Sequence, residues 1–110
     1  MAVNYLAKNL IPAATVETVL YTVPAAATGI LNSLRVTNDN STSSLLTVNL
    51  YPGGGATAHA LLRTYSLPVR GTMDVFSGIP CTVETGDIIK VQSSEDDVAF
   101  HLSYLEVDRT

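Results

Sequence analysis

The run Val98-Ala99-Phe100-His101-Leu102-Ser103-Tyr104 decides the fold, because apolar side chains occupy every second position in it. Successive side chains of a β-strand point to opposite faces of the sheet, so this alternation predicts a strand with one buried face. Val98, Phe100, Leu102 and Tyr104 are expected to face the core, and His101 to lie on the outer face. The sequence therefore predicts a long last strand over residues 98–107.

Earlier segments of the chain show the same period of two. Each is bounded by residues that favour turns, such as the polar run 39–44 and the glycines at 53–55. The predicted faces are as follows: Val19, Tyr21 and Val23 opposite Thr18, Leu20 and Thr22; Ile30, Leu34 and Val36 inward with Leu31, Ser33, Arg35 and Thr37 outward; and Leu46, Val48 and Leu50 inward.

The remaining strands are expected at residues 3–10, 60–67, 72–76, 79–83 and 88–93. Short strands at spacings of about 8–12 residues are typical of an all-β sandwich or barrel. We predict one antiparallel β-sandwich domain of about eight strands over residues 13–110, preceded by an extended N-terminal arm or edge strand over residues 1–12. A chain of 110 residues is too short for an active-site cleft between two domains.

Composition excludes several classes of protein. Only 15% of the residues are charged, although 46% are hydrophobic, whereas ordinary soluble domains carry about 25% charged residues. The longest unbroken apolar stretch, residues 23–27, is far shorter than the ~20 residues of a membrane span. The net charge of −4 disfavours nucleic-acid binding, which needs a basic surface. The N-terminus lacks the pattern of a secretory signal, so synthesis in a cytoplasm is expected.

Residues capable of catalysis or metal binding are few, and no cofactor or catalytic residue is predicted. His59 and His101 cannot supply the three or four converging ligands of a metal-dependent β-barrel enzyme. Cys81 is expected to be a small buried hydrophobic residue. Glu95, Asp96 and Asp97 lack the spacing of a calcium loop, and we interpret them as a solvated turn.

Three segments resemble small β-sandwich virion proteins of tailed bacteriophages. They are Thr18-Val19-Leu20-Tyr21-Thr22-Val23-Pro24-Ala25, Gly29-Ile30-Leu31-Asn32-Ser33-Leu34-Arg35-Val36-Thr37-Asn38 and Leu46-Thr47-Val48-Asn49-Leu50-Tyr51-Pro52-Gly53-Gly54. The similarity continues through the turn Val83-Glu84-Thr85-Gly86-Asp87-Ile88 and covers about residues 15–107 as a pattern of strands and turns. It implies a jelly-roll fold and a structural role, as in capsid decoration (cement) proteins or in tail, neck and fibre components.

The outward strand positions are mostly Thr, Ser, Asn and Leu, and charge is depleted at the centres of protein interfaces. We therefore expect a decoration protein on the outer capsid surface, which binds the major capsid protein and self-associates as a dimer or trimer. The residues expected at interfaces are Val3, Tyr5, Leu6, Leu10, Leu31, Leu45 and Tyr51. The alternatives left open are a tail, neck or fibre-base protein, a host-glycan binding module and a metal-dependent enzyme of the cupin type.

Overall fold

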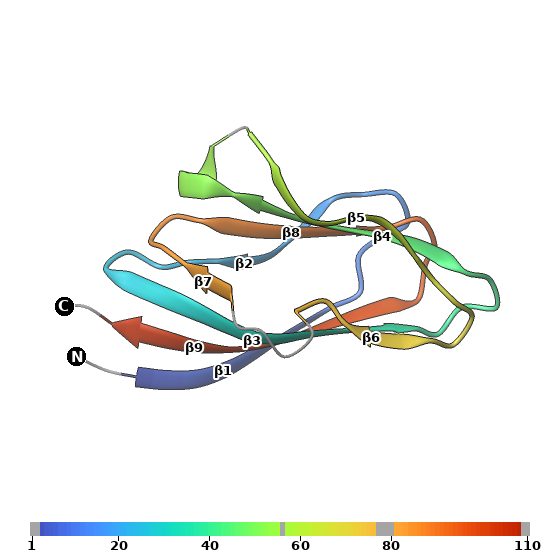
Figure 1. Ribbon diagram of the computed structural model, residues 1–110, viewed down its shortest axis with the longest axis horizontal. Coiled ribbons are helices and arrows are strands. Elements are labelled where there is room, and N and C mark those ends of the chain that lie inside the picture. Colours follow the sequence, from blue (N-terminus) through green and yellow to red (C-terminus); the bar gives the residue numbers. More distant parts are fainter. Residues whose placement is uncertain (1–2, 56, 77–80, 109–110) are drawn as a thin grey trace.

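The computed structural model describes residues 3–55, 57–76 and 81–108, apart from the side chains of Val3, Arg63 and Asp108. Two antiparallel sheets lie face to face and enclose the core (Figure 1). The strands are β1 (Val3–Leu10), β2 (Thr18–Thr22), β3 (Ala27–Asn38), β4 (Ser44–Tyr51), β5 (His59–Leu67), β6 (Thr72–Asp74), β7 (Cys81–Val83), β8 (Ile88–Ser93) and β9 (Val98–Asp108), and a single 3-10 turn (Pro52–Gly54) follows β4.

The strand order is that of a jelly roll. One sheet runs β1-β9-β3-β6, with β7 also paired to β3, and the other runs β2-β8-β4-β5. Apart from the pairs β4–β5 and β6–β7, consecutive strands lie in different sheets, as in the double Greek key of this fold. The described residues form nine strands because β6 and β7 share one strand position beside β3. The predicted all-β antiparallel sandwich is confirmed; residues 79–80 of the expected strand 79–83 lie outside the described residues.

The core confirms the predicted face of β9. Val98, Phe100, Leu102 and Tyr104 are at most 4% exposed, and His101 is exposed on the other face. Leu46 and Val48 are also buried as predicted, whereas Leu50 is partly buried at the margin of the core. The complete buried apolar set is Leu20, Tyr21, Val23, Ala27, Leu31, Leu34, Val36, Leu46, Val48, Leu67, Val83, Ile89, Val91, Val98, Phe100, Leu102 and Tyr104.

The predicted orientations of Ile30 and Leu31 are wrong, because β3 contains a bulge. The register with β9 shifts between Leu31 and Ser33, so one extra residue is inserted there. Such an insertion reverses the alternation of side chains on the two sides of it. Leu34 and Val36 are buried as predicted, but Leu31 is fully buried and Ile30 faces outward. Leu31 is therefore a core residue, and the prediction that it lies at an interface is wrong.

A second bulge, in β2, changes the expected faces there. The register with β8 shifts between Val19 and Tyr21, which buries both Leu20 and Tyr21 and leaves Val19 48% exposed. The Tyr21 ring packs on Tyr104 with a centroid separation of 4.4 Å, and its hydroxyl donates a hydrogen bond of 2.9 Å to Glu106 of the other sheet. Burial, followed by this bond to Glu106, raises the pKa of Tyr21.

Gly29 makes room for this contact between the sheets. A Cβ atom on Gly29 would lie 2.9 Å from Val83 Cγ2 and 3.3 Å from both Cε2 and the hydroxyl of Tyr21. The first distance is shorter than real Cβ contacts, and Val83 is itself fully buried. Glycine is therefore needed here for close packing and not for an unusual backbone angle.

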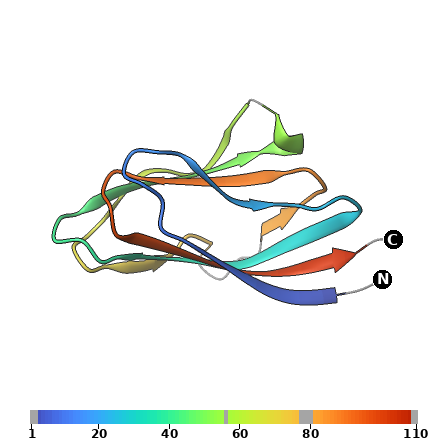
Figure 2. The same ribbon diagram turned by 180° about the vertical axis from the view of Figure 1, so that it is seen from behind.

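The N-terminal segment is a strand of its own sheet. All eight residues of β1 are in register with β9 of the same chain, from Val3 opposite Val107 to Leu10 opposite Phe100. Figure 2 shows β1 along the margin of the sheet, beside β9. β1 is therefore an edge strand of the sheet formed by its own chain, and the boundary expected at residue 12 stays a prediction.

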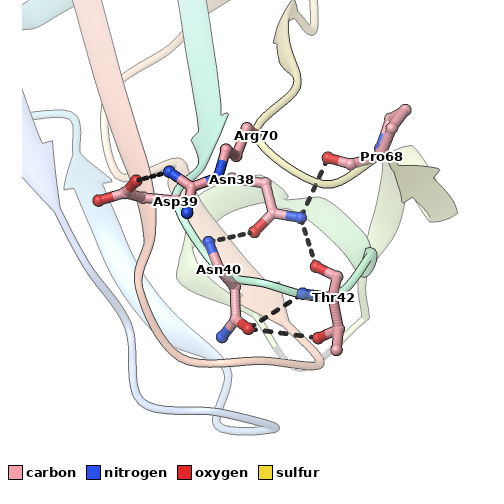
Figure 3. A network of polar contacts seen from close by, with 6 residues as sticks. All are labelled: Asn38, Asp39, Asn40, Thr42, Pro68 and Arg70. Carbon is pink, nitrogen blue, oxygen red and sulfur yellow. Dashed lines mark hydrogen bonds and ion pairs between the residues drawn. The ribbon is translucent and has the colours of Figure 1, made fainter.

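Asn38, the last residue of β3, connects two loops at one end of the sandwich (Figure 3). Its side chain is fully buried, and its Nδ2 lies 2.9, 3.3 and 3.2 Å from the carbonyl oxygens of Thr42, Leu67 and Pro68. Its Oδ1 accepts a bond of 3.0 Å from the backbone N–H of Asn40. One amide thus joins the β3–β4 loop to the β5–β6 loop.

Candidate assembly surface

β1 presents an open hydrogen-bonding edge. It is the terminal strand of its sheet and pairs only with β9 among the described strands, so its other side carries backbone groups without a strand partner. Over residues 3–10 the strand has no proline, and Lys8 is its one charged residue. Charge, proline and short length are the usual protections of an edge strand against pairing. Apart from Lys8, this edge lacks them, which favours β1 as a site of assembly.

An apolar row crosses the outer face of the same sheet. Tyr5 lies directly opposite Leu105 of β9, and Leu105 lies opposite Ile30 of β3. Directly opposed side chains share one face at about 4.5–5.5 Å between Cβ atoms, so these three form a continuous row. Tyr5 is 81% exposed, while Leu105 and Ile30 are half-buried. We call Tyr5, Leu105 and Ile30 the outer row.

The outer face becomes polar farther along the strands. There, Asn9 lies opposite His101, His101 lies opposite Arg35, and Arg35 lies opposite Asp74. A ring nitrogen of His101 is hydrogen-bonded to the Asn9 side chain. The apolar part of the face is therefore confined to the end that carries the chain termini (Figure 1).

The inner side of β1 is only partly covered. Leu6 and Leu10 lie opposite Tyr104 and Phe100, which face the core. Leu10 packs against the core, but Leu6 remains 39% exposed. A side chain that points inward and still contacts solvent leaves apolar area for a second protein to cover.

The residues predicted at interfaces fall into three groups. Tyr5, Leu6 and Leu10 lie together on β1, with the backbone of Val3 at its start. Leu45 and Tyr51 lie on the other sheet, at opposite ends of β4, and Leu45 is 45% exposed. Leu31, as shown above, is in the core.

Tyr51 belongs to a polar cluster on the outer face of the β2-β8-β4-β5 sheet. Its hydroxyl donates to Glu17 Oε1 at 2.7 Å, Asn49 Nδ2 donates to Glu17 Oε2 at 2.8 Å, and Lys90 Nζ lies 4.4 Å from the centre of the Tyr51 ring. Burial alone would raise the pKa of the Glu17 carboxyl, but the two hydrogen bonds and the Lys90 charge outweigh burial, so the pKa of Glu17 is lowered overall. The bond to Glu17 is the main cause of a raised pKa for Tyr51.

The Glu17 shift makes folding stability depend on pH. A carboxyl whose pKa is lower in the folded chain stabilises the fold above its unfolded pKa, and this contribution is lost as the pH falls through the folded pKa. We expect the difference in unfolding free energy between the native chain and Glu17→Gln to shrink as the pH falls from about 5.5 to about 3, since the unfolded pKa of Glu is about 4.3. Urea unfolding at a series of pH values measures this difference, and a difference independent of pH would contradict the assignment.

The remaining chemical candidates have structural roles or stand alone. Asp96 Oδ1 accepts a bond of 3.1 Å from the backbone N–H of Ala14, and the Asp96 carbonyl accepts one of 3.0 Å from Asn40. Cys81 is partly buried against the core, and burial raises its pKa. Within residues 3–55, 57–76 and 81–108, no three His, Cys, Asp or Glu side chains are grouped as metal ligands would be. None of the described helices has the length and apolar character needed to cross a membrane.

Sequence reasoning missed two members of the outer row. Ile30 was expected to face inward, and Leu105 carried no prediction of its own. The signal for Ile30 was the sequence Ile30-Leu31-Asn32-Ser33, in which two apolar residues and then two polar residues break the alternation as a bulge does. Leu105 lies beside Tyr5 and Ile30 only because β9 pairs with β1 and β3, and these strands are far apart in the chain.

No protein-family model matches the chain, and no curated protein sequence matches it. A solved structure of a Bacillus endospore appendage, described as a novel family of disulfide-linked pili, superposes with a TM-score of 0.60 at 13% identity, covering 99% of this chain and 88% of that one. Two crystal structures of a pentameric capsid protein isolated from metagenomic phage sequences give a TM-score of 0.45 at 14% identity. They match 92% of this chain and 59% and 64% of theirs, and are too distant to carry an argument. The likeness to the pilus protein, at this identity, shows that the two chains share a fold.

Proposed function

We propose that this chain is a structural subunit of a bacteriophage virion, a decoration protein that binds the assembled shell of the major capsid protein and stabilises it. The observation that carries the proposal is the open edge of β1 with the 81% exposed Tyr5 beside it. Exposed aromatic side chains are typical anchors of protein interfaces, and an open edge can accept a further strand. The proposed location is the outer surface of the capsid, after synthesis in the host cytoplasm.

Self-association is proposed through β1. Antiparallel pairing of two identical strands has a two-fold axis, so this edge favours the dimer over the trimer. If the axis passes through Leu6, Leu6 faces its own copy and Lys8 faces Asn4 of the second copy. This register avoids a contact between two lysines and covers the exposed side of Leu6.

The outer row is proposed to contact the shell. In the dimer, the two sheets continue into each other, and both outer rows lie on one face. Two rows presented together bind a repeating lattice more tightly than one, because the second contact forms at a high effective concentration. A protein that binds the assembled shell and not the free subunits shifts the equilibrium toward assembly.

The nearest alternative is a tail, neck or fibre-base subunit, and copy number separates it from the decoration protein. When purified protein is added to empty, expanded phage heads, a decoration protein saturates at a number comparable to that of the major capsid protein. A neck or tail protein appears only in the small fixed number of one ring. Quantitative gel densitometry of the purified particles measures this ratio.

The Bacillus endospore appendage is described as a disulfide-linked pilus. The same kind of assembly is disfavoured for this chain. A polymer joined by disulfides needs at least two cysteines in each subunit, and this chain has one, Cys81. Cys81 is also partly buried.

A further inference from the structure

A hollow lies on the outer face of the β2-β8-β4-β5 sheet, on the opposite side of the sandwich from the outer row. Its volume is about 350 Å³, and it is lined by Thr47, Asn49, Ala58, Ala60 and Thr64. This volume is near the lower limit of ligand pockets, which measure roughly 300–1,000 Å³. Ala58, Ala60 and Thr64 are exposed, so the hollow opens to solvent.

The backbone around the hollow departs twice from regular pairing. The register between β4 and β5 shifts between Leu46 and Val48 and again between Val48 and Asn49. Thr64, in the first of these bulges, has a φ of +50°, which is strained for a β-branched residue. Bulges and strained residues concentrate at functional sites, where they direct side chains that a regular strand would place elsewhere.

The polar groups of the lining are held in place. Thr47 Oγ1 accepts a bond of 3.3 Å from the Thr64 backbone N–H, so the Thr47 hydroxyl hydrogen is available to donate. Asn49 Nδ2 is anchored to Glu17 at 2.8 Å, which orients the amide. Its carbonyl oxygen and second N–H take part in no hydrogen bond among the described residues. Pre-organised donors and acceptors of this kind bind a ligand without the entropic cost of ordering them.

The lining also restricts the chemistry of the ligand. Among the residues whose side chains the structure describes, the five that line the hollow are all uncharged, which disfavours ions and phosphorylated molecules. Hydroxyl and amide groups beside alanine methyl groups suit a ligand whose own surface alternates hydroxyl and C–H groups. We propose that the hollow binds one neutral sugar ring, the terminal residue of a glycan chain that leaves through the open side.

The experiment is a titration followed by two-dimensional amide NMR. The probes are the methyl glycosides of glucose, galactose and N-acetylglucosamine, the disaccharides lactose and cellobiose, and glucose 6-phosphate as a charged comparison. At least one neutral glycoside is expected to shift the amide signals of the five lining residues and to saturate in the millimolar range. A disaccharide with the same terminal ring is expected to bind at least as tightly.

Ala60→Leu places a larger side chain in the hollow from an exposed position. It is expected to weaken sugar binding by about tenfold or more, which is the effect of one extra methylene group in other pockets. Ala99→Leu, the same change on the outer face of the other sheet, is the matched control and is expected to bind like the native chain. The proposal is overturned if no neutral glycoside shifts these signals, if Ala60→Leu binds equally well, if glucose 6-phosphate binds as tightly, or if a methyl glycoside binds but the disaccharide with the same terminal ring does not. Since the hollow and β1 lie on different sheets, each of these outcomes leaves the proposed assembly function untouched.

Discussion

Replacing Leu6 by cysteine, in a chain whose Cys81 is replaced by alanine, is expected to convert most of the protein to a disulfide-linked dimer under mild oxidation. In the proposed register the two Leu6 residues face each other across the two-fold axis. Opposed residues of antiparallel strands have Cα atoms about 4.5–5.5 Å apart, within the range that a disulfide spans. Non-reducing gel electrophoresis and mass spectrometry measure the dimer.

Lys8→Cys in the same background is the matched control. Lys8 is exposed on the same side of β1, but in this register the two copies of residue 8 are displaced by four positions, about 13 Å along the strand. It is expected to remain monomeric on the gel. Equal cross-linking of both variants, or of neither, would contradict β1 pairing in this register.

Asn38→Ala is expected to lower the free energy of unfolding by about 2–4 kcal/mol. A buried polar group that loses its hydrogen-bond partner costs about 1–3 kcal/mol, and the Asn38 side chain has several such partners. The change removes the donor to the Thr42, Leu67 and Pro68 carbonyl oxygens and the acceptor for the Asn40 N–H. It also leaves a small cavity in a fully buried position. Urea unfolding of the two proteins measures the difference.

Asn4→Ala is the control for this loss, because Asn4 is exposed on β1 and its removal should change stability by no more than about 0.5 kcal/mol. The Arg70–Asp39 ion pair in the same loop region is 4.0 Å long between exposed side chains and should contribute little. A loss for Asn38→Ala no greater than for Asn4→Ala would show that the loops do not depend on this amide.

Alternation in the sequence predicted the sandwich well where strands are regular. In β9 and β4, apolar residues at every second position identify the buried face correctly because the register is continuous there for several residues. In β2 and β3 the same reasoning failed at the bulges, which interrupt alternation at single residues. Leu31 was assigned to an interface for this reason and is instead fully buried.

The candidate surfaces were less accessible to prediction than the core. Tyr5 and Leu6 were identified from their place in an apolar N-terminal segment, but their neighbours Leu105 and Ile30 are set by pairing between distant strands. The hollow depends on two bulges and on a left-handed Thr64, which no local pattern indicates. Glu17 joins Asn49 and Tyr51 only after β2 and β4 are brought into one sheet.

The pairing of β1 with β9 limits how the role of the N-terminal segment can be tested. Deleting residues 2–10 would remove a strand paired with β9 along its whole length and expose a new edge. Loss of binding in such a deletion would then report damage to the sheet as well as loss of an interface. Single substitutions on β1 separate the two effects.

The most direct test of the central claim is the saturation of empty, expanded phage heads by the purified protein, measured for the native chain and for Tyr5→Asp. The native chain is expected to bind at a copy number comparable to that of the major capsid protein. Tyr5→Asp changes an 81% exposed side chain, so this variant is expected to fold normally. It is expected to bind at least about 30-fold more weakly, because the loss of an aromatic anchor at an interface costs about 2 kcal/mol of binding free energy or more. Failure of the native chain to bind heads, or binding unaffected by Tyr5→Asp, would contradict the account.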